Sequence, residues 1–236
     1  MVNRLSGVFL FACLLLLTSC FEIRETLEIR KEGDGAYTMI MDFSRSKSLF
    51  QMIMQLADNE QEMQREFGGN PLQGLDSGFQ ELSAYLNAMD GIHEAHGIKD
   101  EDSFRFGIAF NFDNINALNL ALSEIDASDQ KTNYRPYYDY SKGKLDKTNY
   151  FNMQNLTKEI KPEEDFAADN EVFKTKMEEL YETVSYTITI KTDGRIRRFT
   201  NEDAVLSQDK TELVYSKTLK ELTSKNIDIS NEIRFR

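Results

Sequence analysis

Few residues in this chain have the types and spacing that metal binding requires. The only two histidines stand in the segment His93-Glu94-Ala95-His96. A helical zinc motif spaces its two histidines four residues apart, whereas these are three apart. If the segment is a strand, we expect the two rings to point to opposite faces. The spacing therefore predicts ordinary loop or strand residues and no metal site.

Acidic residues are numerous, but none is spaced like a recognised site. The segments Asp100-Glu101-Asp102 and Asp126-Ala127-Ser128-Asp129 lack the alternating ligands and the glycine of a calcium-binding loop. The chain also has no Gly-x-Ser-x-Gly elbow, no supported Ser-x-x-Lys motif and no phosphate-binding glycine loop. We therefore expect a protein that is not an enzyme and has no cofactor. A hydrolase without a known motif is the less favoured alternative.

Cys20 is the residue whose position says most about chemistry. Residues 8–17 form an apolar run after Arg4, which is about half the length that a bilayer-spanning helix needs. This pattern predicts a secretory signal over residues 1–19. Leu17-Thr18-Ser19-Cys20 resembles the lipobox of bacterial lipoproteins. The resemblance implies cleavage before Cys20 and a lipid anchor on its thiol, and two or more acyl chains hold a protein stably at a membrane.

The charge of the chain limits its partners. Lys and Arg number 28 and Asp and Glu number 40, a net charge of −12. Such a body repels nucleic acid and anionic membrane surfaces. We therefore expect no nucleic-acid partner, membrane contact through the lipid on Cys20, and an envelope protein as the candidate partner. Phe21, in place of the aspartate that retains enterobacterial lipoproteins at the inner membrane, favours the outer membrane.

The hydrophobic pattern of the body predicts both strands and helices. Period-two alternation predicts a hairpin over residues 22–43 that turns at residues 32–35, and a strand over residues 104–112. It also predicts a second hairpin over residues 185–200 that turns at Asp193-Gly194, a strand over residues 211–218 and a strand at the C-terminus. Helical spacing predicts helices that begin at Ser44, near Asp76, after an Asp113 cap and at Pro162.

This order of elements predicts the fold class. Hairpins and helices are interleaved without the regular alternation of a parallel α/β sheet. We therefore expect an α+β fold with a largely antiparallel sheet built from hairpins and helices packed on one face. Residues 20–236 are expected to form a single globular domain with one or two lobes, after the signal peptide of residues 1–19.

Tyrosines gather in two predicted strands near residues 133–140 and 144–151. Tyrosine is enriched at protein interfaces, but it also favours strands for packing reasons. The candidate partner surface consists of Tyr134, Tyr137, Tyr138, Tyr140 and Tyr150. Met52, Met54 and Met63 of the helix predicted from Ser44 either line an adaptable pocket or pack in the core.

The start of the body resembles a wider group of proteins. The lipobox cysteine, the charged strand after it, Glu32-Gly33-Asp34-Gly35-Ala36-Tyr37 and Met41-Asp42-Phe43-Ser44 resemble uncharacterised envelope lipoproteins common in Bacteroidota, and the LppM-type lipoprotein domain. Only the role of Cys20 carries over. We therefore expect a membrane-anchored envelope lipoprotein that serves as a binding or assembly module. The alternative is a carrier of lipid or of a small apolar ligand.

Overall fold

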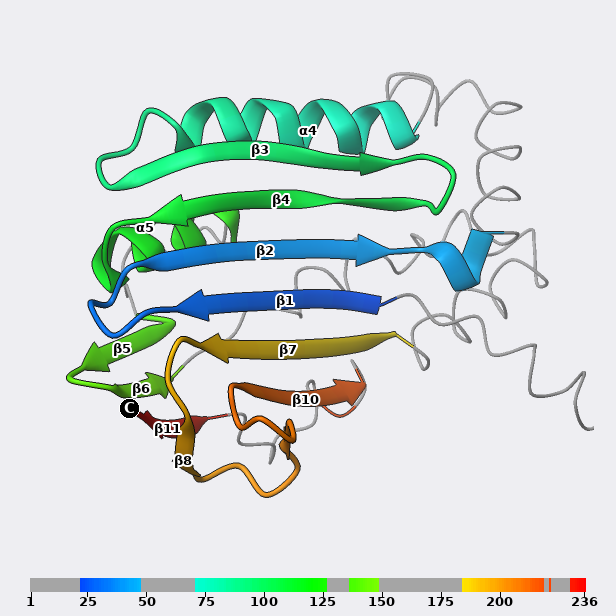
Figure 1. Cartoon of the computed structure of the whole chain (residues 1–236). Helices are drawn as coiled ribbons and strands as arrows, with labels where there is room; N and C mark the ends of the chain where they lie inside the picture. The colour runs from blue at the N-terminus through cyan, green and yellow to red at the C-terminus, as the bar shows by residue number, and fades with distance from the viewer. Residues whose placement is uncertain (1–21, 48–70, 127–135, 149–183, 219–220, 222–229) are drawn as a thin grey trace, which may run out of the picture.

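The computed structural model describes residues 22–47, 71–126, 136–148, 184–218, 221 and 230–236. These residues form a seven-stranded sheet, a four-stranded sheet and two α-helices. The seven-stranded sheet is mixed but mostly antiparallel and the four-stranded sheet is antiparallel, so the predicted α+β fold class is confirmed (Figure 1).

The seven-stranded sheet has the strand order β3-β4-β2-β1-β7-β10-β9. Its neighbouring strands are antiparallel except for β1 and β7, which run parallel. The strands are β1 (Glu22–Ile29), β2 (Gly35–Asp42), β3 (Ile92–Asp100), β4 (Arg105–Phe112), β7 (Ser185–Thr192), β9 (Val205–Leu206) and β10 (Glu212–Thr218).

The first predicted hairpin is confirmed. β1 and β2 pair without irregularity from Glu22 opposite Asp42 to Ile29 opposite Gly35. Gly33 in the turn has a φ of 90°, a backbone conformation that glycine adopts at low cost. Residues of one parity in each strand are buried beneath the sheet, among them Leu27 and Tyr37. Because β4 pairs with β2 on the other side, the hairpin lies in the interior of the sheet.

The second predicted hairpin is wrong. β8 (Ile196–Phe199) does not return along β7 but pairs with β11 (Asn231–Phe235) in the four-stranded sheet. That sheet has the order β5-β6-β11-β8 and includes β5 (Tyr138–Ser141) and β6 (Lys144–Lys147). The segment at Asp193-Gly194 is therefore a crossing between sheets. Gly194 has no positive φ, and glycine is needed there because a Cβ would overlap the backbone of Arg236.

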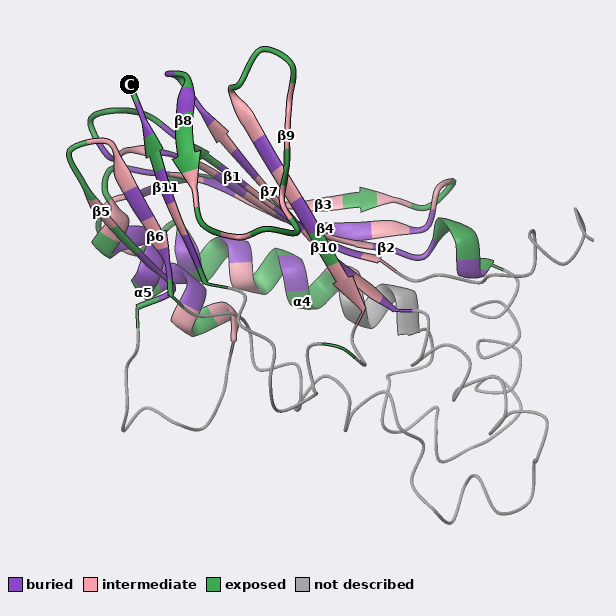
Figure 2. Ribbon diagram, turned by 90° about the horizontal axis from the view of Figure 1, so that it is seen from below, coloured by how far each residue is buried: buried purple, intermediate pink, exposed green. Residues whose placement is uncertain are grey.

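The two described α-helices begin at positions that differ from the predicted ones. α4 (Pro71–Leu86) begins before Asp76, which fits the tolerance of proline in the first turn of a helix. α5 (Ile115–Ile125) is capped by Asn114 and not by Asp113, since the Asn114 Oδ1 accepts hydrogen bonds from two helix N–H groups. Both helices lie on one face of the seven-stranded sheet (Figure 2), as predicted.

Three other predicted segments can be followed only in part. The helix expected from Ser44 begins as a 3-10 turn over Ser44–Ser46, and Met52, Met54 and Met63 lie outside the described residues. The helix predicted from Pro162 also lies outside them. The two tyrosine-rich strands are shorter than expected, and their turn places Lys142 and Gly143 at positive φ.

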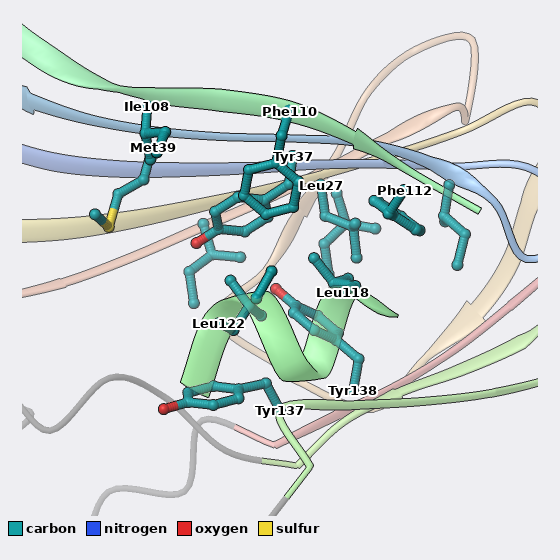
Figure 3. Packing of buried hydrophobic residues seen from close by; sticks show 14 of the residues in the cluster. Leu27, Tyr37, Met39, Ile108, Phe110, Phe112, Leu118, Leu122, Tyr137 and Tyr138 are labelled. Carbon is teal, nitrogen blue, oxygen red and sulfur yellow. The ribbon is translucent and has the colours of Figure 1, made fainter. Parts of the chain in front are cut away.

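The core lies between the seven-stranded sheet and α5. Leu118 and Leu122 of α5 are fully buried and pack between sheet residues and the tyrosines at the start of β5 (Figure 3). The sheet contributes Leu27, Tyr37, Phe110 and Phe112 to this cluster. The interior beneath β1 and β2 is thus closed by α5 and by the four-stranded sheet.

Candidate functional site

Two charged side chains are fully buried where the two sheets meet. Glu25 of β1 is 0% exposed and Lys147 of β6 is 1% exposed. The Lys147 Nζ lies 3.0 Å from Glu25 Oε1 and 3.3 Å from Glu25 Oε2. The two residues are 122 positions apart in the chain, so this ion pair joins the seven-stranded sheet to the four-stranded sheet.

Two tyrosine hydroxyls complete the surroundings of the carboxylate. Tyr138 of β5 donates a hydrogen bond to Glu25 Oε1, and Tyr186 of β7 donates one to Glu25 Oε2. The Lys147 Nζ also donates to the Tyr138 hydroxyl at 2.9 Å and lies 4.2 Å from the centre of the Tyr138 ring. We call Glu25, Tyr138, Lys147 and Tyr186 the inter-sheet cluster. Each carboxylate oxygen in this cluster accepts two hydrogen bonds.

Burial shifts the proton affinities in this cluster. Desolvation lowers the pKa of Lys147, and the charge of Glu25 opposes that change. Desolvation raises the pKa of Tyr138 and of Tyr186 well above the ordinary value, and the negative charge of Glu25 raises both further. The two phenols therefore stay protonated and act as donors to the carboxylate.

The cluster has the residue types of a proton-transfer site but the setting of a structural one. A lysine of lowered pKa beside a phenol could accept a proton, yet no member of the cluster is more than 2% exposed. The ammonium, the carboxylate and the two phenols also use their hydrogen-bonding capacity on one another. A buried polar network that is fully satisfied specifies one arrangement of its elements, and the geometry therefore fits a clamp between the two sheets.

The sequence contained a signal for this cluster. Glu25 has the same strand parity as Ile23 and Leu27, which are both buried. Lys147 likewise shares the parity of buried Leu145. A charged residue at an inward position of a strand needs a partner, because an unpaired buried charge costs several kcal/mol (about 3–5). Parity could therefore have identified both residues, but not their pairing with each other.

A second buried carboxylate lies beside the start of β1. Asp42 is 2% exposed, and its Oδ2 lies 2.7 Å from Arg24 Nη2 and 3.0 Å from Arg105 Nε. Its Oδ1 accepts a hydrogen bond from the Ser44 N–H at 2.9 Å. Burial by itself would raise the pKa of Asp42, but the hydrogen bonds from Ser44 and the two arginine charges outweigh it and lower that pKa. Asp42 thus ties together the ends of β1, β2 and β4.

The structure corrects the predicted tyrosine surface. Tyr138 is 0% exposed and Tyr137 is 4% exposed, so neither can present its ring to a partner. Tyr140 is partly buried, with its ring stacked on Phe235 at a centroid distance of 6.0 Å. Tyr134 and Tyr150 lie outside the described residues, as does Cys20. Tyr137 and Tyr138 are buried because the start of β5 packs on α5, so the packing preference of tyrosine explains these two residues.

The histidines are placed differently from the expectation. Both belong to β3, but a bulge between His93 and His96 pairs them with Asn111 and Ala109 of β4. Because those two partners are two residues apart, both imidazoles lie on the same outer face of the sheet. The His93 Nε2 lies 3.0 Å from an Asp113 carboxylate oxygen. Within the described residues, no group of three or more metal-ligating side chains is found.

The acidic segment at residues 100–102 forms part of a turn. The Asp100 Oδ1 accepts a hydrogen bond from the Ser103 N–H at 2.9 Å. The Glu101 carboxylate lies 2.8 Å from Lys99 Nζ. These carboxylates therefore serve a β-turn and a surface ion pair. In the second acidic segment, Asp126 accepts a hydrogen bond from the Tyr137 hydroxyl, and residues 127–129 lie outside the described part of the chain.

Comparisons with known proteins give one structural likeness. No protein-family model matches the chain, and no curated protein matches it. The NMR structure of the folded domain of the LppM protein of Mycobacterium tuberculosis is similar with a TM-score of 0.41 and 7% sequence identity. The likeness covers 91% of this chain and 89% of that one. None of the described helices is long and apolar enough to cross a membrane.

Proposed function

We propose that the chain is a lipid-anchored lipoprotein of the bacterial envelope and that its α+β domain serves as a non-enzymatic binding or assembly module. The lipid is carried by Cys20 after removal of residues 1–19, and the outer membrane is the proposed location. The proposal is supported chiefly by the place of β1, which begins two residues after the proposed anchoring cysteine.

β1 begins at Glu22, two residues after Cys20. Two extended residues span at most about 7 Å, so a lipid on Cys20 would hold the domain next to the headgroups without a flexible tether. β1 is also an inner strand, paired with β2 on one side and with β7 on the other. A pull on the lipid would therefore act on the middle of the sheet.

The end of the sheet near the proposed anchor is braced by charge. Arg24 of β1 and Arg105 of β4 both contact the buried carboxylate of Asp42. Thr187 of β7 donates a hydrogen bond to Glu22 at 2.7 Å. These contacts link β1 to its neighbours within its first three residues, which suits a strand that carries an anchor.

A binding role fits the buried chemistry better than catalysis does. The inter-sheet cluster combines a carboxylate, an amine and two phenols, but all of them are engaged with one another inside the protein. The carrier alternative depends on a cavity beside Met52, Met54 and Met63, which lie outside the described residues. We therefore favour recognition by the surface of the domain.

The anchor is tested by expressing the full chain with the substitution Cys20→Ala and separating membranes from soluble material. We expect the wild type in the membrane fraction, with a mass that corresponds to a chain starting at a lipidated Cys20, and the variant in the soluble fraction. Cys13→Ala is the matched control, since it removes a thiol within the leader and should leave the anchor intact. Retention of Cys20→Ala at the membrane, or an unmodified terminus in the wild type, would contradict the proposal.

A further inference from the structure

Exposed arginines gather on one side of the four-stranded sheet, on its edge strand β8, on the residue just before β8 and on the neighbouring strand β11. The members of this arginine patch are Arg195, Arg197, Arg198 and Arg234. All four side chains are exposed, and the side chain of Arg234 is 56% exposed. β8 forms the edge of its sheet and β11 is its neighbour. In a chain with a net charge of −12, such a concentration of cations stands out.

The strand register places two arginines of the patch opposite each other. Arg198 pairs with Arg234, and Ile196 pairs with Phe235, so a bulge leaves Arg197 without an opposite residue. Ile196 and Phe235 point inward and are buried. A bulge re-aims the side chain of the extra residue, and Arg197 and Arg198 are both exposed. Backbone hydrogen bonds between Arg195 and Arg236 hold the start of β8 in place.

The cations stand directly beside one another across three strands. Arg234 of β11 lies between Arg198 of β8 and Lys144 of β6 in register, and neighbouring strands are about 4.8 Å apart. Like charges directly opposite each other destabilise a sheet. An anionic group placed over Arg198, Arg234 and Lys144 would remove the repulsion between them.

Other side chains of the protein neutralise only part of the charge on Arg198, Arg234 and Lys144. Glu232 is shared, since its carboxylate lies 2.9 Å from Arg234 Nε and 3.1 Å from Lys144 Nζ. Lys144 also pairs with Asp146 at 2.7 Å. Within the part of the chain that the structure describes, Arg195, Arg197 and Arg198 take part in no ion pair. Three guanidinium groups are therefore available to an external anion.

We propose that the arginine patch is the docking surface for an acidic segment of a protein partner. This proposal rests on the binding role proposed above and names the chemistry of the partner. A guanidinium group binds a carboxylate through two parallel hydrogen bonds, and an extended peptide presents side chains of one face about every 6.8 Å. A short run of acidic residues laid over β8 and β11 matches Arg197 and Arg198 of β8, Arg195 just before that strand and Arg234 of β11.

The position of the patch favours a protein over the anchoring membrane. The Lys31 N–H, just after β1 ends, lies 3.3 Å from an Asp193 carboxylate oxygen, two residues before Arg195. β8 and β11 therefore lie near the end of β1 that is opposite Glu22 and the proposed anchor (Figure 1). An anionic bilayer would also be repelled by the rest of this acidic chain, whereas a short peptide contacts the patch alone.

The test measures binding of a fluorescent peptide of alternating Glu and Ser residues to the detergent-solubilised full chain by anisotropy at low salt. Arg197→Gln with Arg198→Gln should weaken binding about tenfold. The matched control is Arg30→Gln with Lys191→Gln, which changes the net charge equally at exposed ion pairs outside the patch. It should change the affinity less than about twofold. Thermal unfolding of each variant confirms that the fold is retained.

Several outcomes would overturn the proposal. Equal weakening by the two double variants would show that only net charge matters. Absence of wild-type binding at millimolar peptide would contradict the proposed docking surface. It would leave the Cys20 fractionation result unaffected. If phosphatidylglycerol vesicles bind through the patch and the peptide does not, the occupant is a membrane. If the Arg197/Arg198 variant self-associates while peptide binding is unchanged, the arginines protect a strand edge.

Discussion

Removal of the Lys147 ammonium is the most direct test of the inter-sheet cluster. In Lys147→Met the aliphatic volume is kept, while Glu25 loses the contacts at 3.0 and 3.3 Å and keeps the hydroxyls of Tyr138 and Tyr186. Breaking a buried ion pair from one side costs about 3–5 kcal/mol. Because two donors remain, we expect a loss near the lower limit, about 3 kcal/mol of unfolding free energy.

The measurement is urea unfolding followed by far-ultraviolet circular dichroism, since the chain has no tryptophan. Lys144→Met is the matched control, because Lys144 lies on the same strand and pairs with Asp146 and Glu232 at the surface. We expect no measurable change in that variant.

A double-mutant cycle separates pairing from packing. Glu25→Gln leaves the ammonium without a counter-charge and should also destabilise the fold, whereas Glu25→Gln with Lys147→Met leaves no buried charge. We expect the double variant to be more stable than the sum of the single losses predicts, by about 1 kcal/mol or more. Strictly additive losses of unfolding free energy, or a Lys147→Met variant as stable as the wild type, would refute the role of the Glu25–Lys147 ion pair in holding the two sheets together.

Three other perturbations test separate parts of the structure. Gly194→Ala should destabilise the fold by about 1–3 kcal/mol in urea unfolding, because its Cβ would overlap the Arg236 backbone. The control Gly78→Ala, in α4 with nothing near its Cβ, should be neutral or stabilising. Equal effects of the two substitutions would contradict the close approach of Gly194 to Arg236. The wild type should lose stability as the pH falls below 3.8, the ordinary pKa of aspartate, because the lowered pKa of folded Asp42 makes that carboxylate stabilising only while it is ionised. Asp42→Asn should be less stable than the wild type at pH 7 and should lack this part of the pH dependence. An Asp42→Asn variant with the acid unfolding profile of the wild type would count against this role of Asp42. Above pH 10 the free energy of unfolding should fall by up to about 1.4 kcal/mol per pH unit for each buried tyrosine, because the unfolded chain releases phenolic protons that the folded chain keeps. Phenolate absorbance should therefore appear together with loss of circular dichroism. Phenolate absorbance from a chain that is still folded would be the contrary result. The tyrosines concerned, all with raised pKa, are Tyr37, Tyr138, Tyr186 and Tyr215.

The local patterns that were predicted well are those in which one face of an element is buried. The alternation from Arg105 to Phe112 predicted β4, and Ile115, Leu118 and Leu122 predicted α5. The hairpin of β1 and β2 combined such alternation with a glycine turn at Gly33. In each case the residue types themselves restrict the backbone or the buried face, so short-range information is sufficient.

The errors arose where a long-range contact overrides a local signal. Asp193-Gly194 has the composition of a hairpin turn, yet β8 gains its hydrogen bonds from β11. The tyrosines near β5 have the composition of an interface, yet α5 covers Tyr137 and Tyr138. Composition describes what a segment could do, whereas the neighbouring element decides which of its groups remain exposed.

The amino-acid sequence by itself determined the acidic balance of this protein and most of its strands and helices, and it predicted a lipid anchor on Cys20. Only the tertiary structure decided that β1 runs parallel to β7, that Glu25 meets Lys147 and that Arg198 lies opposite Arg234. Periodicity along a chain shows which side of an element is buried, because it reflects contact with an apolar interior. It carries no information about which distant segment lies there, since many segments could cover the same face equally well.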